Sequence, residues 1–520
     1  MLSSIACALF GATVASAQGR GGGAWTTTGG DAQRTASVRT DPRITKESVA
    51  KNFQLLWKRT LESPSKQPNA LTQPVLLPNI ISYKGFKALA FFGGAADNVY
   101  ALDYDLSRVF WQRHLESGGA PAAPTASCPG GLTTVTRSTP LAVPTGGGRG
   151  GRGQQPPGPG TPPAAGQGGR AAGPPPAPPS PPMPGSGPGP NAVLGGVAGG
   201  RGGNPNVYAI SSGGKLHALN PQDGTDMVPP IAFLPANANA VGSILIESSL
   251  YAATTGNCGG APNGVWAIEL ADDSYAVSKW ETTTPVAGDG PAFGSDGTIY
   301  IAAGDSIVSL DRKTLKEKAR FTPGNAPFTS SPVVFQSKGR TLVAAANKDG
   351  RVYLTDGSKA LASSAPVSGG NGQIAGLAVW EEGSSRWLLA SVQGPLQSGA
   401  VPGAPANAPA GSIVAFKVAD EGDMPTLQPV WASRDLMRPV TPLVINGVVF
   451  ALASGSDPRE SRVRPAVLYA LDTTTGKDLW NSGDAISSPV RGVGPSGGDG
   501  QVYVVTPDGT IYTFGIPVER

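Results

Sequence analysis

One short strand pattern recurs along this 520-residue chain and limits its possible folds more than any other feature. The pattern approximates apolar–X–apolar–apolar, usually followed by an acidic residue. Its eight copies are VYALD (99–103), LHALN (216–220), VWAIE (265–269), IVSLD (307–311), VYLTD (352–356), IVAFK (413–417), LYALD (468–472) and IYTFG (511–515). Successive copies start 42 to 61 residues apart, except for a first gap of 117 that contains a Gly- and Pro-rich tract. A period of this size, with several strands in each unit, is typical of a β-propeller.

Each unit has the local chemistry of a four-stranded antiparallel blade. A Gly-Gly or Asp-Gly turn precedes the repeated strand, as in VYAISSGGKLHAL (207–219) and VYVVTPDGTIYTF (502–514), and such pairs tolerate the positive φ angles of tight hairpins. Charged residues make up only 15% of the chain, whereas there are 73 glycines and 51 prolines, which disfavours a helical protein. The sequence predicts an all-β, eight-bladed propeller over residues 51–520.

The two ends of the chain are expected to close the ring together. After Phe514 in the eighth copy only residues 515–520 remain, too few for a fourth strand. The segment FQLLWK (53–58) lies just before the first blade and has the pattern of an outer strand. Pairing of this strand with the last blade would remove the open edges of the ring.

The N-terminal residues predict export. MLSSIACALFGATVASAQ combines an apolar run with the small-residue ending Ala15-Ser16-Ala17, as in a secretory signal over residues 1–17. Residues 18–50 would form an N-terminal extension. No later apolar stretch approaches the ~20 residues needed to cross a bilayer. We therefore expect a periplasmic or secreted protein without a transmembrane segment.

A low-complexity tract interrupts the second blade. Residues 144–205 are nearly all Gly, Pro, Ala, Arg and Gln, which cannot bury enough apolar surface to offset the entropy of ordering. A disordered insertion is predicted. The tract contains GGRGGRG (147–153), but an exported protein would not meet nucleic acid, and we expect no nucleic-acid partner.

Two cysteines remain once the signal is removed. Cys128 and Cys258 both lie in loop-like sequence, SCPGG and NCGGAP. In an oxidising compartment an even pair is a candidate disulfide. The alternative is two independent buried thiols.

Tryptophans close the outer strands of several units. In ALDTTTGKDLW (470–480), the Asp472 side chain can bond back to the turn, Gly476 can adopt the left-handed conformation, and the strand ends at Trp480. Tryptophans at corresponding places are Trp57, Trp111, Trp280 and Trp431. Each could be an ordinary core residue, but their recurrence favours a ring that covers the seam between two blades.

The spacing Ala-X-Asp-X-X-Thr-Gly-Lys-X-X-Trp at 470–480 resembles the tryptophan-docking repeat of the pyrroloquinoline quinone (PQQ)-like propellers. That group includes the quinoprotein alcohol dehydrogenases and a non-enzymatic propeller lipoprotein of outer-membrane assembly. GGDAQRT (29–35) and ITKESVAKNFQLLWK (44–58) are similar to the segment before blade one in the dehydrogenases. The resemblance covers most of residues 25–515 and implies the fold more specifically than any chemistry.

The resemblance also implies where an active site would lie. TTGNCGG (254–260) is similar to the stretch whose asparagine binds the metal, so Asn257 is a candidate ligand for metal and cofactor. WETTTPVAGDG (280–290) is similar to the segment that leads to the catalytic aspartate, which makes Asp289 the candidate base. The alternative is that both residues shape turns. The adjacent cysteine pair of the dehydrogenases is absent, as is a Cys-X-X-Cys-His haem motif.

Other catalytic patterns are weak. His114 and His217 are the only histidines, and each lies in or beside a strand. GGNGQIAG (369–376) lacks the βαβ context of a dinucleotide site. The sequence therefore favours an exported binding or scaffold module with an envelope protein partner. The alternative is a divergent dehydrogenase that uses PQQ and calcium, and a third hypothesis is another small ligand or glycan in the channel.

Overall fold

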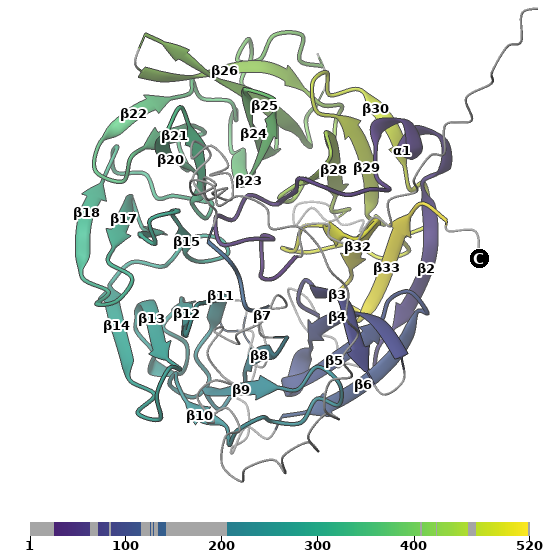
Figure 1. Cartoon of the computed structure of the whole chain (residues 1–520). Coiled ribbons are helices and arrows are strands. Elements are labelled where there is room, and N and C mark those ends of the chain that lie inside the picture. The colour runs from purple at the N-terminus through teal and green to yellow at the C-terminus, as the bar shows by residue number, and fades with distance from the viewer. Residues whose placement is uncertain are drawn as a thin grey trace, which may run out of the picture.

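The computed structural model describes residues 25–62, 71–82, 85–115, 125, 128, 134–141, 205–405, 408–422, 424–455 and 464–517. Eight sheets surround a central axis in the order of the chain (Figure 1). Each blade contains four antiparallel strands, and the sheet of one blade has a fifth, parallel strand, β1 (Ser37–Val38), at its inner edge. The predicted eight-bladed propeller is therefore confirmed.

The strands of each blade run from the axis outwards (Figure 1). Blades 1 and 2 consist of β3 (Val75–Ser82), β4 (Gly85–Gly93), β5 (Asn98–Asp103) and β6 (Arg108–His114), then β7 (Val135–Arg137), β8 (Val207–Ile210), β9 (Lys215–Leu219) and β10 (Ile231–Ala232). Blades 3 and 4 consist of β11 (Ala240–Ile246), β12 (Ser249–Thr254), β13 (Asn263–Glu269) and β14 (Val277–Thr282), then β15 (Ala292–Phe293), β16 (Ile299–Ala303), β17 (Ser306–Leu310) and β18 (Glu317–Phe321).

The second half of the ring has the same organisation. Blades 5 and 6 consist of β19 (Val333–Ser337), β20 (Arg340–Ala346), β21 (Val352–Thr355) and β22 (Ala360–Ser363), then β23 (Gln373–Glu382), β24 (Ser385–Gln393), β25 (Gly411–Glu421) and β26 (Met424–Ala432). Blade 7 consists of β27 (Leu443–Ile445), β28 (Val448–Ala453), β29 (Val467–Asp472) and β30 (Asp478–Asn481). Blade 8 consists of β31 (Ser496–Gly498), β32 (Gln501–Val505), β33 (Thr510–Gly515) and β2 (Gln54–Thr60).

All eight copies of the repeated pattern lie on the third strand of a blade. These strands are buried along most of their length because the blades stack face to face and cover both sides of each sheet. β17 is buried at all five positions, whereas the outer strand β14 alternates between exposed and half-buried residues. The core therefore lies between neighbouring blades, as where Phe91 of blade 1 shares a cluster with Val207 of blade 2.

The ring closes as predicted. β2 pairs antiparallel with β33, from Gln54 opposite Gly515 to Thr60 opposite Thr510. The observed strand extends two residues beyond the predicted FQLLWK segment and starts one residue later. The first and last parts of the propeller thus share one sheet, so that neither leaves an unpaired edge at the joint.

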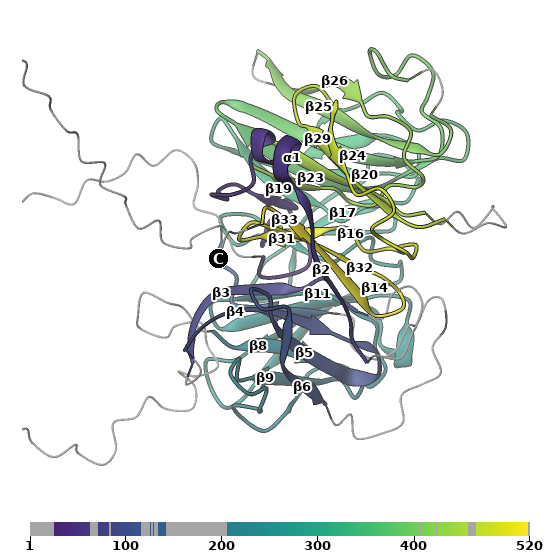
Figure 2. The same ribbon diagram turned by 90° about the vertical axis from the view of Figure 1, so that its right-hand side faces the viewer.

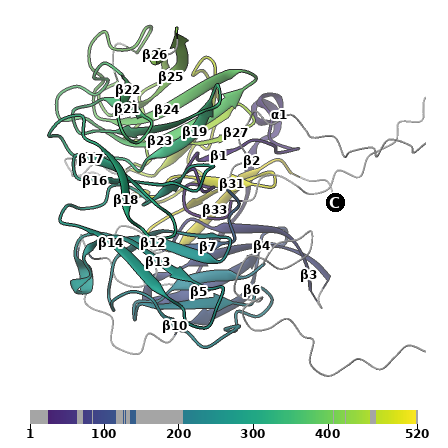
Figure 3. The same cartoon turned by 60° about the vertical axis from the view of Figure 1, so that its left-hand side comes forward.

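A single α-helix leads into this closing strand. In α1 (Lys46–Asn52) Thr45 is the N-cap, its side chain accepting from the Ser48 N–H while Ser48 Oγ accepts from the Thr45 N–H, a reciprocal capping box. The helix lies at one face of the ring and buries Val49 there (Figures 2 and 3). The two other helical pieces are the short 3₁₀ turns η1 (Ala95–Asp97) and η2 (Cys258–Gly260).

No helix within the described part of the chain is long and apolar enough to span a lipid bilayer.

Residues 25–38, called the central segment below, run through the middle of the ring (Figure 1). Its carbonyl groups accept hydrogen bonds from the inner strands of six blades. The donors are the N–H groups of Leu76, Arg137, Phe293, Val334, Val379 and Val444, at 2.7 to 2.9 Å from the oxygens of Trp25, Thr26, Ala32, Gln33, Thr35 and Ala36. A seventh blade is reached by Thr27 Oγ1, which donates to Ser243 O at 2.6 Å.

The central segment solves a problem that a propeller ring creates. The inner strand of each blade has one edge that faces the channel, and unpaired backbone groups buried there would be costly. The segment satisfies several of these groups and ends in β1 (Ser37–Val38), which pairs parallel with β27. Its Trp25 and Ala32 side chains are fully buried. The central segment is therefore part of the core of the protein.

Two of the predicted segments lie outside the described residues: the signal over residues 1–17, and the insertion over 144–205 apart from Pro205. Both stay predictions, as do the boundaries of the N-terminal extension and the propeller.

Candidate functional site

A cavity of about 220 Å³ lies at the centre of the ring, at the end where the inner strands begin. The central segment contributes Arg34 to its lining, and blades 4, 5 and 7 contribute Asp289, Ser331 and Thr441. Within the described chain, Arg34 and Asp289 are the only charged residues among those that line it. The predicted residue Asp289 thus lies at the axis of the propeller. We call this cavity the funnel.

Asp289 is fixed through its backbone rather than through its carboxylate. Its N–H donates to Ser331 Oγ. Gly242 of β11 approaches so closely that a Cβ there would lie 1.9 Å from the Asp289 carbonyl oxygen. Across the described residues no hydrogen bond or ion pair involves the Asp289 carboxylate. The loop is therefore held rigidly while the acidic group itself stays unpartnered.

Arg34 of the central segment also lines the funnel and is only 3% exposed. Its Nε donates to Pro291 O at 3.0 Å, its Nη2 to Gly242 O at 2.8 Å, and its Nη1 to Thr28 O. Two of these three bonds tie the central segment to blades 3 and 4, and the third, to Thr28, lies within the segment itself. The main role of this guanidinium is therefore structural.

Three ionisable groups share this centre. Burial lowers the pKa of Arg34 to about 10, while the nearby carboxylates of Asp289 and Asp31 act to raise it. Burial raises the pKa of Asp289, against the effect of the Arg34 charge. Burial also raises the pKa of Asp31, although Thr35 Oγ1 donates to it at 2.5 Å and lowers the pKa. Arg34 thus interacts with two carboxylates, and Arg39 also acts to lower the pKa of Asp31.

Asn257 occupies a different environment. It is exposed, adopts a left-handed backbone with φ 51°, and precedes the 3₁₀ turn η2. Its N–H donates to Asn263 Oδ1 at 3.3 Å, a contact that shapes the turn between β12 and β13. Asp289 lies on the separate loop between β14 and β15, and among the described residues no hydrogen bond or ion pair joins it to Asn257.

The predicted disulfide is present. Cys128 and Cys258 are bonded, with their Cα atoms 5.5 Å apart and 130 residues between them in the chain. The bond connects the loop before blade 2 to η2 in blade 3, next to Asn257. It is a long-range link between blades and is unlike an adjacent cysteine pair.

Two of the five tryptophans donate a hydrogen bond across a blade seam. Trp431 of blade 6 donates from Nε1 to Thr473 O of blade 7 at 2.9 Å, and its ring lies against Gly476. Trp111 of blade 1 donates to Pro221 O of blade 2 at 2.8 Å and lies against Gly224 in the same way.

The other three tryptophans make apolar contacts. Trp480 of blade 7 packs edge-on against Phe514 of blade 8, with ring centroids 5.6 Å apart. Trp57 packs against Tyr503 of its own blade, at 6.4 Å. Trp280 borders an apolar cluster of blades 3 and 4. For Trp57 and Trp280 the role at a seam stays a prediction.

Asp472 stabilises the turn beside the Trp431 seam. Its Oδ1 accepts from the N–H groups of Thr474 at 2.8 Å and Thr475 at 3.0 Å, and Lys46 pairs with its Oδ2 at 2.9 Å. Burial acts to raise the pKa of Asp472, but the hydrogen bonds from Thr474 and Lys46 lower it to about 2. The carboxylate is therefore ionised in all but very acidic solution.

The residues of the funnel do not fit PQQ together with calcium. Its volume lies below the ~300–1,000 Å³ of typical sites for ligands of that size. PQQ carries three carboxyl groups, whereas the one cation available, Arg34, already donates to three carbonyls. Calcium takes about six to eight oxygen ligands, and no group of three or more acidic, histidine or cysteine side chains suited to a metal occurs in the described chain.

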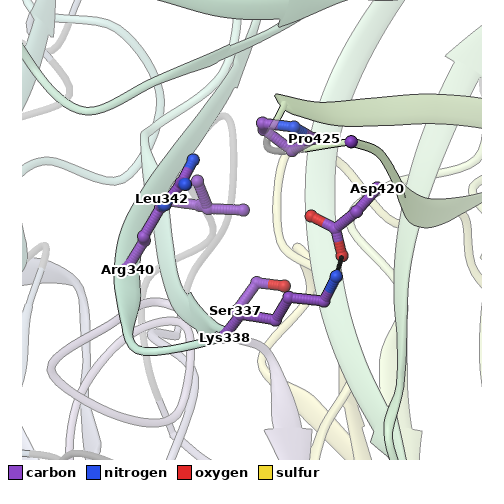
Figure 4. Close-up of a pocket in the computed structure, with 7 residues that line it drawn as sticks. Ser337, Lys338, Arg340, Leu342, Asp420 and Pro425 are labelled. Atoms are coloured by element: carbon purple, nitrogen blue, oxygen red, sulfur yellow. Dashed lines mark ion pairs between the residues drawn. The ribbon is translucent and has the colours of Figure 1, made fainter.

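A second cavity of about 260 Å³ lies between the β19–β20 hairpin of blade 5 and the β25–β26 hairpin of blade 6 (Figure 4). Lys338 Nζ pairs with Asp420 Oδ2 at 3.0 Å across it, beside the apolar side chains of Leu342 and Pro425. Lys338 is 70% exposed, and a pair of this kind contributes about 0–1 kcal/mol. The cavity is a surface groove with no unpaired group at its centre.

Sequence reasoning missed the role of Arg34 and the network around His217. His217 Nδ1 lies 3.0 Å from Asp226 Oδ1, and Arg113 of blade 1 donates to the same carboxylate. His217 Nε2 is buried and has no hydrogen-bond partner among the described residues, and burial lowers the pKa of the imidazole. No spacing in the sequence could reveal either feature, because each depends on segments that are distant in the chain.

Comparisons with known proteins agree with this geometry at the level of the fold. No protein-family model and no curated protein matches the chain. Among solved structures, the quinohemoprotein alcohol dehydrogenase of Comamonas testosteroni matches with a TM-score of 0.55 and 14% identity, over 96% of this chain and 81% of that one. The chain has the fold of the PQQ-type propellers.

Two further structures place limits on what this likeness implies. A europium-containing methanol dehydrogenase matches with a TM-score of 0.55 and 11% identity, over 95% of this chain and 98% of that one. Sqt1 of Saccharomyces cerevisiae matches with a TM-score of 0.52 and 10% identity, over 90% of this chain and all of that one. Structures named as dehydrogenases and one that is not so named thus share this propeller architecture, and the fold alone does not assign an activity.

Proposed function

We propose that this protein is an exported, non-catalytic binding or scaffold module of the cell envelope, with a protein partner. The observation that carries the proposal is the central segment. Carbonyls of residues 25–36 accept hydrogen bonds from the inner strands of six blades, so that much of the channel is filled by the chain itself. A ring filled in this way offers loops and blade edges to a partner rather than a deep cofactor pocket.

Export is supported by two independent features. The first 17 residues have the pattern of a cleavable secretory signal. Cys128 and Cys258 are paired, and disulfides form and persist mainly in oxidising compartments. Mass spectrometry of the mature protein should find Gln18 at its N-terminus. An intact Met1 on protein isolated from the cytoplasm would contradict export.

The second candidate is a divergent PQQ- and calcium-dependent dehydrogenase. One observation favours it: Asp289 lies in a central cavity with its pKa raised by burial, and perturbed acids in clefts are frequent at catalytic sites. A group with a raised pKa can accept a proton near neutral pH. The poor fit of the surrounding residues to the quinone and to calcium weighs against this candidate.

Titration of the signal-free protein with PQQ and calcium separates the two candidates. A ligand that binds only the native state raises the melting temperature with concentration. The scaffold proposal expects no saturable shift with PQQ, with or without calcium. A saturable shift that requires calcium and disappears in Asp289→Asn would favour the dehydrogenase and overturn the scaffold proposal.

A further inference from the structure

We propose that the funnel binds a small organic ammonium ion, with Asp289 as its anionic partner and the hydroxyls of Ser331 and Thr441 as hydrogen-bond acceptors. This inference goes beyond the scaffold role. A ligand in the funnel would not require a protein partner at the blade edges, and a protein partner would not require the ligand.

The first argument is the state of the Asp289 carboxylate. Asp289 lines the cavity, and no hydrogen bond or ion pair involves its carboxylate within the described chain. A carboxylate that is partly removed from water without a partner carries an unmet desolvation cost. Burial accordingly raises its pKa. A ligand that donates hydrogen bonds and carries positive charge would offset this cost.

The second argument is the balance of charge. Arg34 is the one cation at the funnel, but its Nε, Nη1 and Nη2 each donate to a backbone carbonyl. Two carboxylates, Asp289 and Asp31, interact with this single guanidinium. Asp31 is also attracted by Arg39, whereas Arg34 is the one cation that acts on Asp289. A positively charged ligand would therefore add a second cation beside the Asp289 carboxylate.

The third argument is that the binding groups are already in place. Ser331 Oγ holds the Asp289 N–H, and Gly242 lies against the Asp289 carbonyl, so the acidic side chain projects from a fixed loop. Gly376 packs equally closely on Thr441, where a Cβ would be 1.9 Å from Oγ1. A rigid site loses little entropy when the ligand binds.

The volume of the funnel and the polar groups that line it indicate which class of cation would bind. At about 220 Å³ the funnel suits a ligand of a few non-hydrogen atoms. A metal ion such as calcium would need several more oxygen ligands than one carboxylate and two hydroxyls provide. An ammonium group has three N–H donors and is matched by these three acceptors. A small primary amine, such as an amino alcohol, is therefore the expected ligand class.

Calorimetric titration of the mature protein with ethanolamine tests this inference. Ethylene glycol has the same size without the charge, and potassium and calcium chloride supply charge without the organic group. We expect saturable binding of ethanolamine, no binding of ethylene glycol, and no saturable binding of either metal ion. Asp289→Asn should weaken ethanolamine binding by at least ~10-fold, as loss of a charged hydrogen bond predicts.

Asp273→Asn is the matched control, since it removes an exposed carboxylate from the blade 3 turn before β14 and should leave binding unchanged. Equal binding of ethylene glycol and ethanolamine would overturn the inference, as would unchanged binding by Asp289→Asn. Saturable, Asp289-dependent binding of potassium or calcium in place of ethanolamine would also overturn it. The comparison of charged and neutral ligands uses the natural protein, so it stands even if a variant fails to fold. Failure here would leave the result of the PQQ titration unaffected.

Discussion

The seam between blades 6 and 7 and the seam between blades 3 and 4 use the same turn in different ways. In both turns an aspartate side chain, Asp472 or Asp311, accepts backbone N–H groups, and the fifth residue of the turn is left-handed. At the first seam that residue is Gly476, against which Trp431 packs while it donates to Thr473 O.

At the second seam the left-handed residue is Leu315, with φ 52°. Leu315 is only 2% exposed and joins the apolar cluster that Trp280 borders. No hydrogen bond from the Trp280 ring to blade 4 occurs among the described residues. The comparison shows that the aspartate is enough to maintain the turn, whereas glycine at the fifth position is needed where a tryptophan ring packs against it. At the seam where no ring docks, a leucine occupies the fifth position in spite of the strain of its left-handed backbone.

The largest expected effect is the loss of stability when the Trp431 or the Trp280 side chain is removed. Trp431→Ala should lower the free energy of unfolding by about 3–5 kcal/mol, as for other large aromatic residues removed from a core. Trp280→Ala should cost about 1–2 kcal/mol, because its ring is half-buried and makes no hydrogen bond across the seam. Denaturant unfolding of both variants measures the difference. Equal losses would show that the two seams do not differ as described.

A smaller effect is expected from the docking glycine. A Cβ on Gly476 would lie 2.4 Å from the Trp431 ring, so Gly476→Ala combines a steric clash with a positive φ. We expect a loss of about 2–4 kcal/mol. Gly483→Ala is the control, since Gly483 has φ 52° but open space around its Cβ position. That variant should cost about 1 kcal/mol. If both substitutions lower the stability equally, contact with the Trp431 ring does not explain why glycine is needed at position 476.

The smallest effect is expected at the blade 1–2 seam, where Trp111 docks beside a buried His217. Burial lowers the pKa of His217 in the folded protein below its ordinary 6.5, although Asp226 acts to raise it. The unfolded chain therefore binds the proton more readily, and stability falls as the pH drops from about 6.5 through the lowered folded pKa. Melting temperatures measured across this range should show the decline.

Two histidine variants make the pH prediction specific. His217→Gln should flatten the decline, because the titrating group is gone. His114→Gln is the control, since His114 is exposed at the end of β6 and should leave the decline in place. An unchanged profile in His217→Gln would assign the pH dependence to another group.

The repeated third strands made the blades predictable from the sequence, because covering both faces of a strand demands apolar residues that a local pattern reveals. The Asp472 turn was predictable from the local chemistry of aspartate and glycine in tight turns, and the closing strand near Trp57 from its apolar pattern and its place before blade 1. The disulfide followed from the count of cysteines, once the predicted signal is set aside.

The central segment was not predictable in the same way. It binds the inner strands mainly through its carbonyl groups, which every residue possesses, and its residues have no period. Arg34 and Asp289 line the same cavity only because the central segment runs through the middle of the ring. For Asn257 the sequence suggested a site instead of missing one. The surrounding residues resemble a metal-binding stretch, but Asn257 lies exposed in a turn.

Hydrogen exchange of the inner strands tests most directly whether the chain fills its own channel. The backbone amides of Phe293, Val334, Val379 and Val444 donate to the central segment. We predict that peptides covering these residues exchange as slowly as the neighbouring middle strands β16, β20, β24 and β28. Fast exchange of the inner-strand peptides, while the middle strands stay protected, would contradict the account and return the open channel to consideration as a cofactor site.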